Sequence, residues 1–163
     1  MTEIRLIQDV DITSFSEALD AVARERKFLA FLEGPSIDST REFVRANIQA
    51  GVPHYVALAD NRVVGWCDIC KNTARPVFKH VGHLGMGVLA GYRGQGLGRL
   101  LITAAINHAQ KIGLTRIELE VYGSNEAAIG LYKSIGFQHE GTKRQHAYFG
   151  DHYEDSHQMA LIF

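Results

Sequence analysis

One stretch decides the fold of this chain: Val88-Leu89-Ala90-Gly91-Tyr92-Arg93-Gly94-Gln95-Gly96-Leu97-Gly98-Arg99. We expect an apolar strand to run into a glycine-rich turn, and the turn to run into a helix from Leu97 to about Ile112. The first turn of a helix has backbone N–H groups without partners in the helix, and they carry partial positive charge. Because glycines leave the backbone bare, a phosphate can approach these groups closely. The stretch therefore predicts a cradle for a phosphorylated ligand.

Two common nucleotide-binding patterns fit this stretch poorly. The P-loop needs a Gly-Lys-Ser/Thr sequence, which does not follow the turn. A dinucleotide fingerprint over residues 85–90 should open a helix, but Gly91 and Gly94 come next. It also needs an acidic residue about 20 positions further on, and no acid occurs between Ile69 and Ile117. A nicotinamide-dependent oxidoreductase stays an alternative. The pattern that remains is Arg-x-x-Gly-x-Gly, formed by Arg93, Gly96 and Gly98.

This remaining pattern resembles the acyl-CoA-binding motif of the GNAT-type N-acetyltransferase superfamily, which is written Gln/Arg-x-x-Gly-x-Gly/Ala. A second family signature, Asn-x-x-Ala-x-x-Leu-Tyr, is matched by residues 125–132, and residues 133–137 close it in the usual way. The tail from Glu140 to Met159 is similar to the final hairpin of small bacterial members. The resemblance is specific from about His80 to the C-terminus and general before it.

The length of 163 residues predicts one domain, and the resemblance implies that residues 1–163 form a single N-acetyltransferase domain. The net charge of −1 gives the molecule no bias toward nucleic acid. The stretch from Ile69 to Ile117 is free of acids, which suits a polyanionic cofactor, although such basic residues are also typical of a solvated surface. Its basic residues are Lys71, Arg75, Lys79, Arg93, Arg99, Lys111 and Arg116.

The sequence predicts a cytoplasmic protein without a metal site or a membrane partner. No signal peptide or membrane span is visible. Cys67 and Cys70 are spaced Cys-x-x-Cys, but on a strand this odd separation sends them to opposite faces, and no second pair completes a zinc site. We interpret them as buried or half-buried thiols. His80 and His83 diverge for the same reason.

The periodicity predicts an α/β fold, a mixed central sheet of about seven strands flanked by about four helices, in the order β-α-α-β-β-β-α-β-α-β-β. The fold implied by the family resemblance is the same. The expected helices are 12–32, a second from a cap at Ser39 or Thr40 to about Ala50, 97–112 and 126–135. The expected strands are 3–7, 54–59, 62–69, 80–89, 116–122, 137 to about 141, and 147–161 with a turn near Gly150.

The resemblance implies acetyl-CoA as the co-substrate and assigns it mostly to the main chain. The N–H groups of residues 94–99 would hold the diphosphate, with Arg93 shaping the turn more than touching phosphate. The preceding strand would bind the pantetheine arm through Met86 and Val88, with the Val88 N–H aimed at the thioester oxygen. The expected cofactor-binding residues are Met86, Val88, Arg93, Gly94, Gln95, Gly96, Leu97, Gly98, Arg99, Asn125 and Tyr132.

Tyr132 is the candidate general acid. It lies seven residues after Asn125, which is nearly two helical turns, so both side chains project from one face of the helix. Asn125 is also a plausible N-cap of that helix. The general base is open, because the strand before the glycine turn carries no acid. The candidates are His83, Glu120, or ordered water with backbone carbonyls.

The resemblance places the acceptor pocket at the loop of residues 31–36 and the hairpin of residues 148–153. Glu33 and Tyr148 are the candidate substrate-binding residues, and Glu33 could pair with an ammonium group. We expect an N-acetyltransferase that moves an acetyl group from acetyl-CoA to a primary amine of a small molecule, by direct attack in a ternary complex. A protein N-terminal or lysine acetyltransferase is an alternative, and so is a non-catalytic acyl-CoA-binding sensor. Family members are often dimers, so a homodimer is a further expectation.

Overall fold

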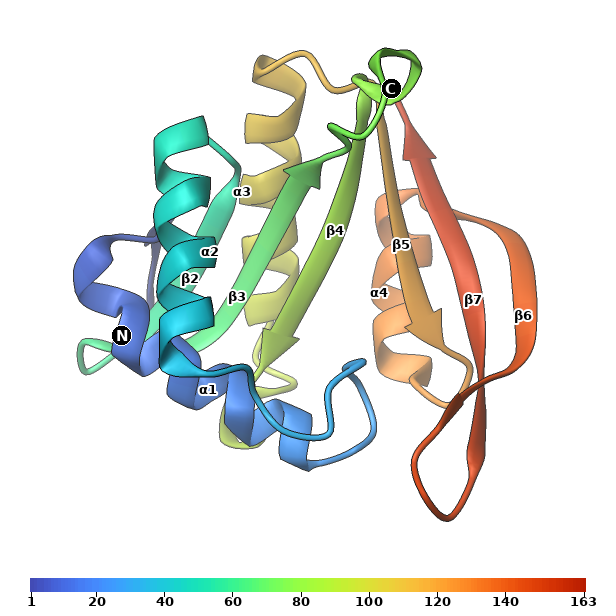
Figure 1. Cartoon of the computed structure of the whole chain (residues 1–163), viewed down its shortest axis with the longest axis horizontal. Coiled ribbons are helices and arrows are strands. Elements are labelled where there is room, and N and C mark those ends of the chain that lie inside the picture. The colour runs from blue at the N-terminus through green and yellow to red at the C-terminus, as the bar shows by residue number, and fades with distance from the viewer.

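The computed structural model describes residues 1–163 and contains one seven-stranded sheet of order β1-β2-β3-β4-β5-β7-β6 (Figure 1). The predicted α/β class and element order are confirmed. The strands are β1 (Glu3–Leu6), β2 (His54–Ala59), β3 (Arg62–Lys71), β4 (Val81–Val88), β5 (Arg116–Tyr122), β6 (Gln138–Tyr148) and β7 (Tyr153–Ile162). The helices are α1 (Ile12–Arg24), α2 (Ile37–Ala50), α3 (Leu97–Lys111) and α4 (Glu126–Ile135).

The sheet is split between its two central strands. All neighbouring strands are antiparallel except β4 and β5, which run parallel and pair only between residues 81–83 and residues 116–118. Beyond His83 and Glu118 the two strands diverge, and Figure 1 shows the gap widening toward their carboxyl ends. On its β5 side, the remainder of β4 therefore has backbone groups without a strand partner, which is the usual place for a ligand in an open sheet.

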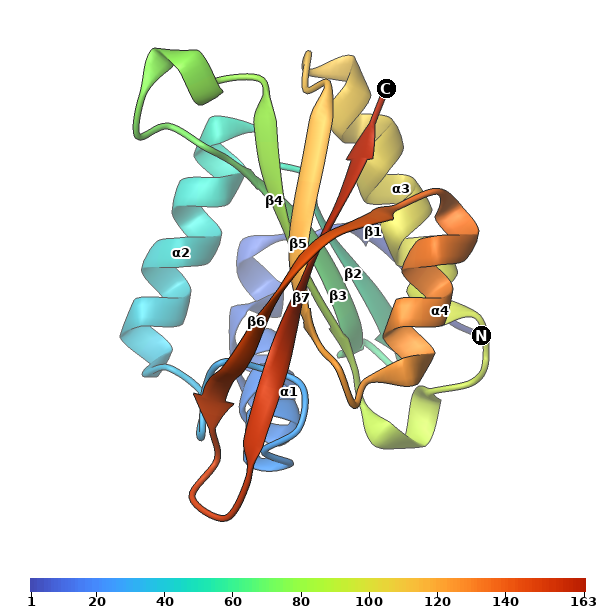
Figure 2. The same ribbon diagram turned by 90° about the vertical axis from the view of Figure 1, so that its right-hand side faces the viewer.

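Two apolar layers hold the helices on the sheet, with α1 and α2 on one face and α3 and α4 on the other (Figure 2). On the first face, Phe15 and Trp66 meet edge to face with ring centroids 5.7 Å apart. On the second, Leu101 of α3 packs with Ile69 and Ile117 of the sheet, all fully buried. Each such side chain contributes about 1.5–3 kcal/mol relative to exposure. No helix has both the length and the apolar character needed to cross a membrane.

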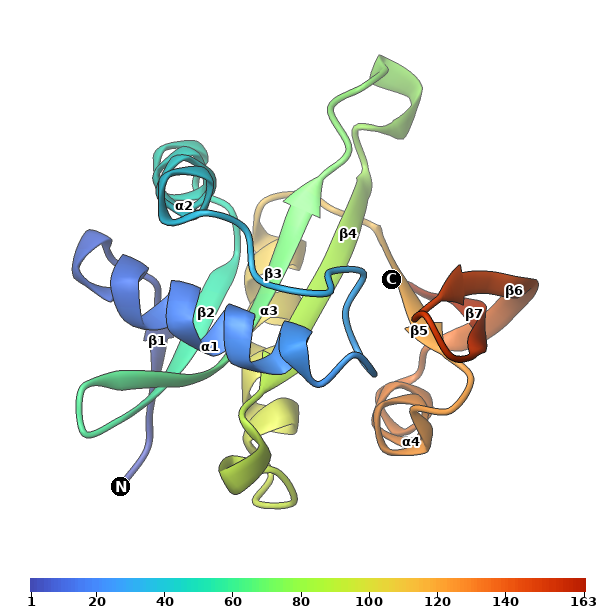
Figure 3. The same ribbon diagram turned by 60° about the horizontal axis from the view of Figure 1, so that its bottom comes forward.

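The first two helices are shorter than the sequence pattern predicts. α1 ends at Arg24 rather than Leu32, because Arg26 takes a left-handed backbone with φ of 54°. Residues 25–36 form a loop that passes beneath the sheet toward β5 (Figure 3). α2 begins at Ile37, with Ser36 as its N-cap accepting from the Ser39 N–H at 3.1 Å. The expected cap at Ser39 or Thr40 is therefore wrong by about one helical turn.

Strand β6 is longer than predicted. It runs to Tyr148 instead of ending near Gly141, with register irregularities between residues 139 and 141 and between residues 143 and 147. It lies at the edge of the sheet, and nearly all of its residues are exposed. Because neither face of the strand is buried, its sequence lacks the alternation by which a strand is recognised.

The two cysteines lie on opposite faces of β3, as predicted. Cys67 is fully buried in the apolar layer under α3. Cys70 is half-buried on the α2 side, with its sulfur 4.0 Å from the Asn47 side-chain oxygen. Both are free thiols. Cys67 thus points to the layer of α3, and Cys70 points to the layer of α2. Asp68 lies between them in the sequence and points to the same face as Cys70.

Candidate active site

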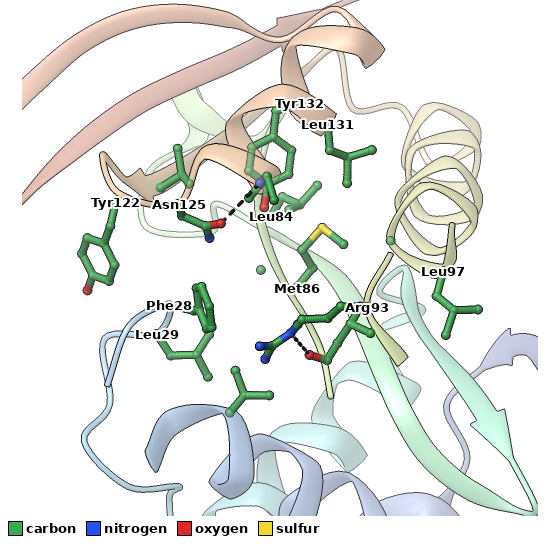
Figure 4. A pocket seen from close by; sticks show the side chains of 18 of the residues that line it. Phe28, Leu29, Leu84, Met86, Arg93, Leu97, Tyr122, Asn125, Leu131 and Tyr132 are labelled. Atoms are coloured by element: carbon green, nitrogen blue, oxygen red, sulfur yellow. Dashed lines mark hydrogen bonds between the residues drawn. The ribbon is translucent and has the colours of Figure 1, made fainter. Parts of the chain in front are cut away.

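A cavity of about 570 Å³ fills the gap between β4 and β5 (Figure 4). Segments far apart in the sequence converge on it. Its wall is made of Val22, residues 28–30 after α1, residues 84–88 of β4, the turn residues 92–94 and 96–99, residues 120–122 of β5, and Asn125, Ala127, Ala128, Leu131 and Tyr132 at and on α4. The cavity thus joins the glycine turn to both ends of the second sequence signature.

The glycine turn is shaped by two left-handed residues, Gly94 with φ of 74° and Gly96 with φ of 82°. A Cβ added at either position would meet no atom within 4 Å, so backbone conformation rather than crowding requires glycine there. Gly96 is the N-cap of α3, and its carbonyl accepts the first bond of the helix, from Leu100 N–H at 3.2 Å. The N–H groups of residues 97–99 therefore have no helical partner.

Position 98 requires a small residue because α4 and β4 both approach α3 closely there. A Cβ on Gly98 would lie 3.3 Å from Leu131 of α4 and 3.4 Å from the terminal methyl of Met86. The start of α3, the start of α4 and β4 consequently converge around the turn, as Figure 4 shows for Met86, Leu131 and Leu97. Because of this close approach, the apolar side chains of Leu131 and Met86 lie next to the free N–H groups at the start of α3.

The free edge of β4 faces the cavity through alternate residues. Leu89 N–H donates to the Val64 carbonyl of β3 at 2.8 Å. Because backbone groups point alternately to the two sides of a strand, those of Met86 and Val88 point to the β5 side, where strand pairing has ended. These are the two residues that the family resemblance assigns to the pantetheine arm.

The side chain of Arg93 forms hydrogen bonds with β4 and with the loop after α1. Its Nε donates to the Val88 carbonyl at 2.8 Å, and its two terminal nitrogens donate to the Glu25 carboxylate at 2.9 and 2.6 Å. The guanidinium also lies 4.7 Å from the centre of the Phe28 ring, a favourable cation–π distance. Arg93 thus fastens the glycine turn to the loop after α1. Figure 4 shows its bond to the Val88 carbonyl.

The other polar residues of the turn differ in their access to the cavity. Arg99 lines it and donates to the Ser134 hydroxyl at 2.6 Å. Gln95 does not line it, because its side-chain amide donates to the Gly91 carbonyl at 3.2 Å. The side chain of Gln95 therefore braces the turn from outside.

Tyr132 and Asn125 face the cavity from α4 and its start (Figure 4). Asn125 is the N-cap, its side-chain oxygen accepting from the Ala128 N–H at 3.3 Å. Tyr132 is 6% exposed, with its ring centre 5.7 Å from that of Phe137. Burial raises the pKa of the Tyr132 phenol well above its ordinary value. The phenol therefore stays protonated across the physiological pH range.

Glu120 reaches the cavity from β5. Its carboxylate accepts from Lys143 of β6 and from Gln158 of β7, each at 2.6 Å. Burial raises the pKa of Glu120, but these two hydrogen bonds outweigh burial and hold the pKa below its ordinary value. The cavity thus contains a carboxylate that is ionised at neutral pH.

Three other candidate residues lie outside the cavity wall. His83 is on β4 with a side chain 60% exposed, and its Nδ1 lies 3.2 Å from Glu118. Glu33 is 71% exposed and 3.4 Å from Arg24. Tyr148 is 59% exposed, and its hydroxyl donates to the Gly150 carbonyl at 2.8 Å. The loop reaches the cavity earlier than expected, through residues 28–30, because α1 stops at Arg24.

The cavity also contains residues that sequence patterns did not single out. Phe28, which was expected as an apolar position of the longer helix, and its neighbour Leu29 reach into the cavity from the loop (Figure 4). Tyr122 lies at the carboxyl end of β5 and packs edge to face on Phe149, with ring centres 5.4 Å apart. Its position at a strand end beside the family signature is the signal that could have identified it.

Comparison with known proteins gives consistent matches. The family model described as "Acetyltransferase (GNAT) family" matches residues 18–137. The N-alpha-acetyltransferase RimI of Mycobacterium tuberculosis is 36% identical over 94 residues, 57% of this chain and 57% of that protein. The L-amino acid N-acetyltransferase AaaT of Escherichia coli is 33% identical over 113 residues, 69% of each protein. The structure of yncA from Salmonella typhimurium with its cofactor acetyl-CoA has a TM-score of 0.93 at 20% identity, covering 99% of this chain and 94% of that chain.

The chain belongs to the GNAT family of acetyltransferases, since the family model matches well over half of it. The predicted family, fold and class of enzyme, an acetyl-CoA-dependent N-acetyltransferase, are confirmed at the level of the family. The match to the Mycobacterium tuberculosis relative spans little more than half the length of that protein. The likeness to yncA, at 20% identity, shows the fold alone.

Proposed function

We propose that this protein transfers the acetyl group of acetyl-CoA to a primary amine of a small molecule, by direct attack in a ternary complex. One observation carries the proposal: a single cavity joins the open N–H groups after Gly96, the free edge of β4, the Tyr132 phenol and the Glu120 carboxylate. Each of these features meets one requirement of acetyl transfer from a thioester to an amine. We call the turn, the β4 edge and α4 the cofactor wall, and residues 28–30 and 120–122 the acceptor wall.

The cofactor wall binds acetyl-CoA mainly through the main chain. The N–H groups of residues 97–99 receive the diphosphate, which favours the positive end of α3. The outward N–H and carbonyl groups of β4 bind the pantetheine arm in the way a neighbouring strand would. The N–H of Val88 stabilises the negative charge that develops on the thioester oxygen during attack.

The acceptor wall binds the amine that receives the acetyl group. An alkyl ammonium has a pKa of ~10.4 and no lone pair for attack, so it must be bound and deprotonated. The ionised Glu120 carboxylate attracts and orients the ammonium group. Tyr132 donates its proton to the departing thiolate, whose pKa is ~8.5 if it resembles that of cysteine. The phenol is suited to this role because it is protonated before the reaction.

The acceptor itself is proposed to be a small molecule, because Phe28 and Leu29, on the loop that Arg93 fastens to the turn, form part of the cavity wall. The similarity to an L-amino acid N-acetyltransferase supports this choice. The similarity to an N-alpha-acetyltransferase supports a protein N-terminus as the second candidate. The two candidate acceptors differ in size. A protein N-terminus continues into further residues, which must pass the loop of residues 28–30, whereas a small molecule does not.

Calorimetric titration with acetyl-CoA, with NADH as the control ligand, tests the cofactor wall. We expect saturable binding of acetyl-CoA alone. Thiol release is then measured with a panel of amino acids, other small amines and short peptides. Turnover on free amino acids or small amines supports the proposal, and turnover restricted to peptides favours the second candidate. Binding of acetyl-CoA without turnover on any amine would identify a sensor and overturn the proposed activity.

A further inference from the structure

A second carboxylate, that of Asp68, lies beside the cavity, next to the cavity residue Gly85. Asp68 is half-buried on β3, on the sheet face covered by α1 and α2. It makes no ion pair, and its side-chain partner is the Cys70 sulfur at 3.5 Å. In the sheet register it stands between His54 of β2 and Gly85 of β4. A carboxylate in this setting is unusual, because half-buried acids are normally paired with a cation.

Gly85 connects Asp68 to the cavity. It is an exposed residue of β4 and part of the cavity wall. A Cβ built on Gly85 would lie 3.7 Å from both carboxylate oxygens of Asp68, and outside the adjacent residues it would meet no other atom within 4 Å. The backbone of Gly85 is not left-handed, so glycine is not required there by conformation. Its missing side chain instead leaves open the space between the cavity and the Asp68 carboxylate.

We propose that Asp68 is the proton acceptor for the acceptor amine, reached through the space over Gly85 either directly or through one water molecule. The inference rests on the proposed function and assigns the general base, for which the sequence alone leaves several candidates. β4 carries no acid of its own, and its histidine, His83, pairs with Glu118 away from the cavity. The neighbouring strand supplies the carboxylate over the position where β4 has no side chain.

The proton balance of the step is complete. Asp68 takes one proton from the ammonium group, and the neutral amine attacks the thioester carbon. The C–N bond forms, the C–S bond breaks, and the thiolate takes the proton of Tyr132. The nitrogen gives its second proton to water, the tyrosinate regains one from water, and Asp68 releases its proton to solvent. The net products are the acetylated amine, the free thiol of coenzyme A and one proton.

The surroundings of the two carboxylates separate their roles. Burial raises the pKa of Asp68 to about 7, with the Cys70 hydrogen bond acting in the opposite direction. Glu120, held by Lys143 and Gln158, has a pKa below its ordinary value. A base works best when its pKa is near the operating pH, and carboxylates whose pKa values are pushed apart commonly divide the work in this way. In this assignment Glu120 binds the ammonium group of the acceptor, and Asp68 accepts and releases its proton.

No cation around Asp68 interferes with this exchange. The titratable groups near Asp68 in the sheet are His54 and His83 on the neighbouring strands and Cys70 on its own strand. Burial lowers the pKa of His54 to about 4, so that imidazole is neutral. From α2, Asn47 contacts both His54 and Cys70 and carries no charge. Most charged side chains of α1 and α2 pair elsewhere, in Glu17–Arg62, Asp20–Arg24, Asp38–Arg41 and Asp9–Arg45, and the remaining one on α2, Glu42, is an exposed acid.

Steady-state kinetics of Asp68→Asn against the best amine test the inference. We expect kcat to fall about 10²-fold or more with the Kd for acetyl-CoA unchanged, and the acidic limb of the wild-type pH profile near pH 7 to disappear. Asp68→Glu should recover part of the activity. Asp38→Asn, on the exposed surface of α2, is the matched control and should behave as wild type.

Gly85→Ala keeps the test informative if Asp68→Asn fails to fold. The added methyl group sits in ordinary contact with the carboxylate, so the fold should survive while kcat falls. An active wild type whose Asp68→Asn variant retains its kcat and its acidic limb overturns this inference alone. A wild type that turns over no amine overturns the proposed function, and this inference with it.

Discussion

The cofactor wall and the acceptor wall of the cavity are built from different materials. Apart from α4, the cofactor wall uses main-chain groups presented within one continuous stretch, from β4 through the turn to the start of α3. The acceptor wall uses side chains from the loop after α1 and from β5, with partners on β6 and β7. Main-chain recognition depends on local backbone geometry, whereas side-chain recognition depends on how distant elements pack. The predictions below test that difference, from the largest expected effect to the smallest.

Tyr132→Phe should separate chemistry from binding most strongly. Removing the hydroxyl leaves the buried ring in contact with Phe137 but takes away the proton donor. We expect kcat to fall about 10²-fold or more, with the Kd for acetyl-CoA within about twofold of wild type, by kinetics and calorimetry. Tyr55→Phe, whose hydroxyl lies near His108 on α3, is the control. Equal turnover in the Tyr132 variant would remove this residue from the mechanism.

Gly96→Ala should weaken acetyl-CoA binding about tenfold. The left-handed φ of 82° strains any residue with a Cβ by about 1–2 kcal/mol, and relief of that strain moves the N–H groups of the turn. Gly113→Ala is a matched control, because Gly113 also has a left-handed φ, of 89°, and open space around it, but lies outside the cavity wall. Both variants should lose similar stability in urea. Loss of affinity in both would show that strain alone weakens binding.

These two variants test the part of the site that is readable from sequence. The turn and α4 follow from local patterns, namely glycine spacing and helical periodicity, and the family resemblance implies that Tyr132 and Asn125 lie beside the turn. The wall around Phe28 could not be predicted in this way, because an apolar residue fits a helix face and a loop in a pocket equally well. The left-handed backbone conformation of Arg26 ends α1, and no sequence motif predicts that conformation.

The contact between Arg93 and Glu25 joins the two walls and shows why pairing at long range escapes sequence analysis. The two residues are 68 positions apart, and nothing in either local pattern indicates the other. The same holds for Asp68 and Gly85, which become neighbours only through the register of β3 and β4. The order of the elements was thus predictable, but the side chains that meet across the sheet were not.

Glu25→Gln should alter the acceptor wall and spare the cofactor wall. The Arg93–Glu25 pair is bidentate and only partly exposed, at 34% and 29%, so it orders the loop better than a fully exposed pair would. We expect the KM for the amine to rise about three- to tenfold, with the Kd for acetyl-CoA within about twofold. Glu17→Gln, which breaks a surface pair with Arg62 from the helix that precedes this loop, is the control. A larger effect on acetyl-CoA than on the amine would place Arg93 in the cofactor wall alone.

Stability against pH gives the smallest effect and tests Asp68 without any substrate. Burial raises the pKa of Asp68 to about 7, so the folded protein holds a proton that the unfolded chain loses near pH ~3.9. This contribution to stability is fully present below pH ~3.9 and is lost as the pH rises through 7. Asp68→Asn removes it, so the free energy of unfolding of the variant minus that of wild type should grow between pH 4.5 and pH 7.5, by about 1 kcal/mol or more.

Urea unfolding at four pH values across that range measures this difference, with Asp38→Asn, on the exposed surface of α2, as the matched control. A gain of stability combined with a loss of activity is the signature of a residue kept for its chemistry rather than for the fold. A difference that shrinks as the pH rises would mean that the ionised Asp68 is stabilised by its surroundings. The carboxylate would then have a low pKa, and Asp68 would lack the property for which it is assigned as the base.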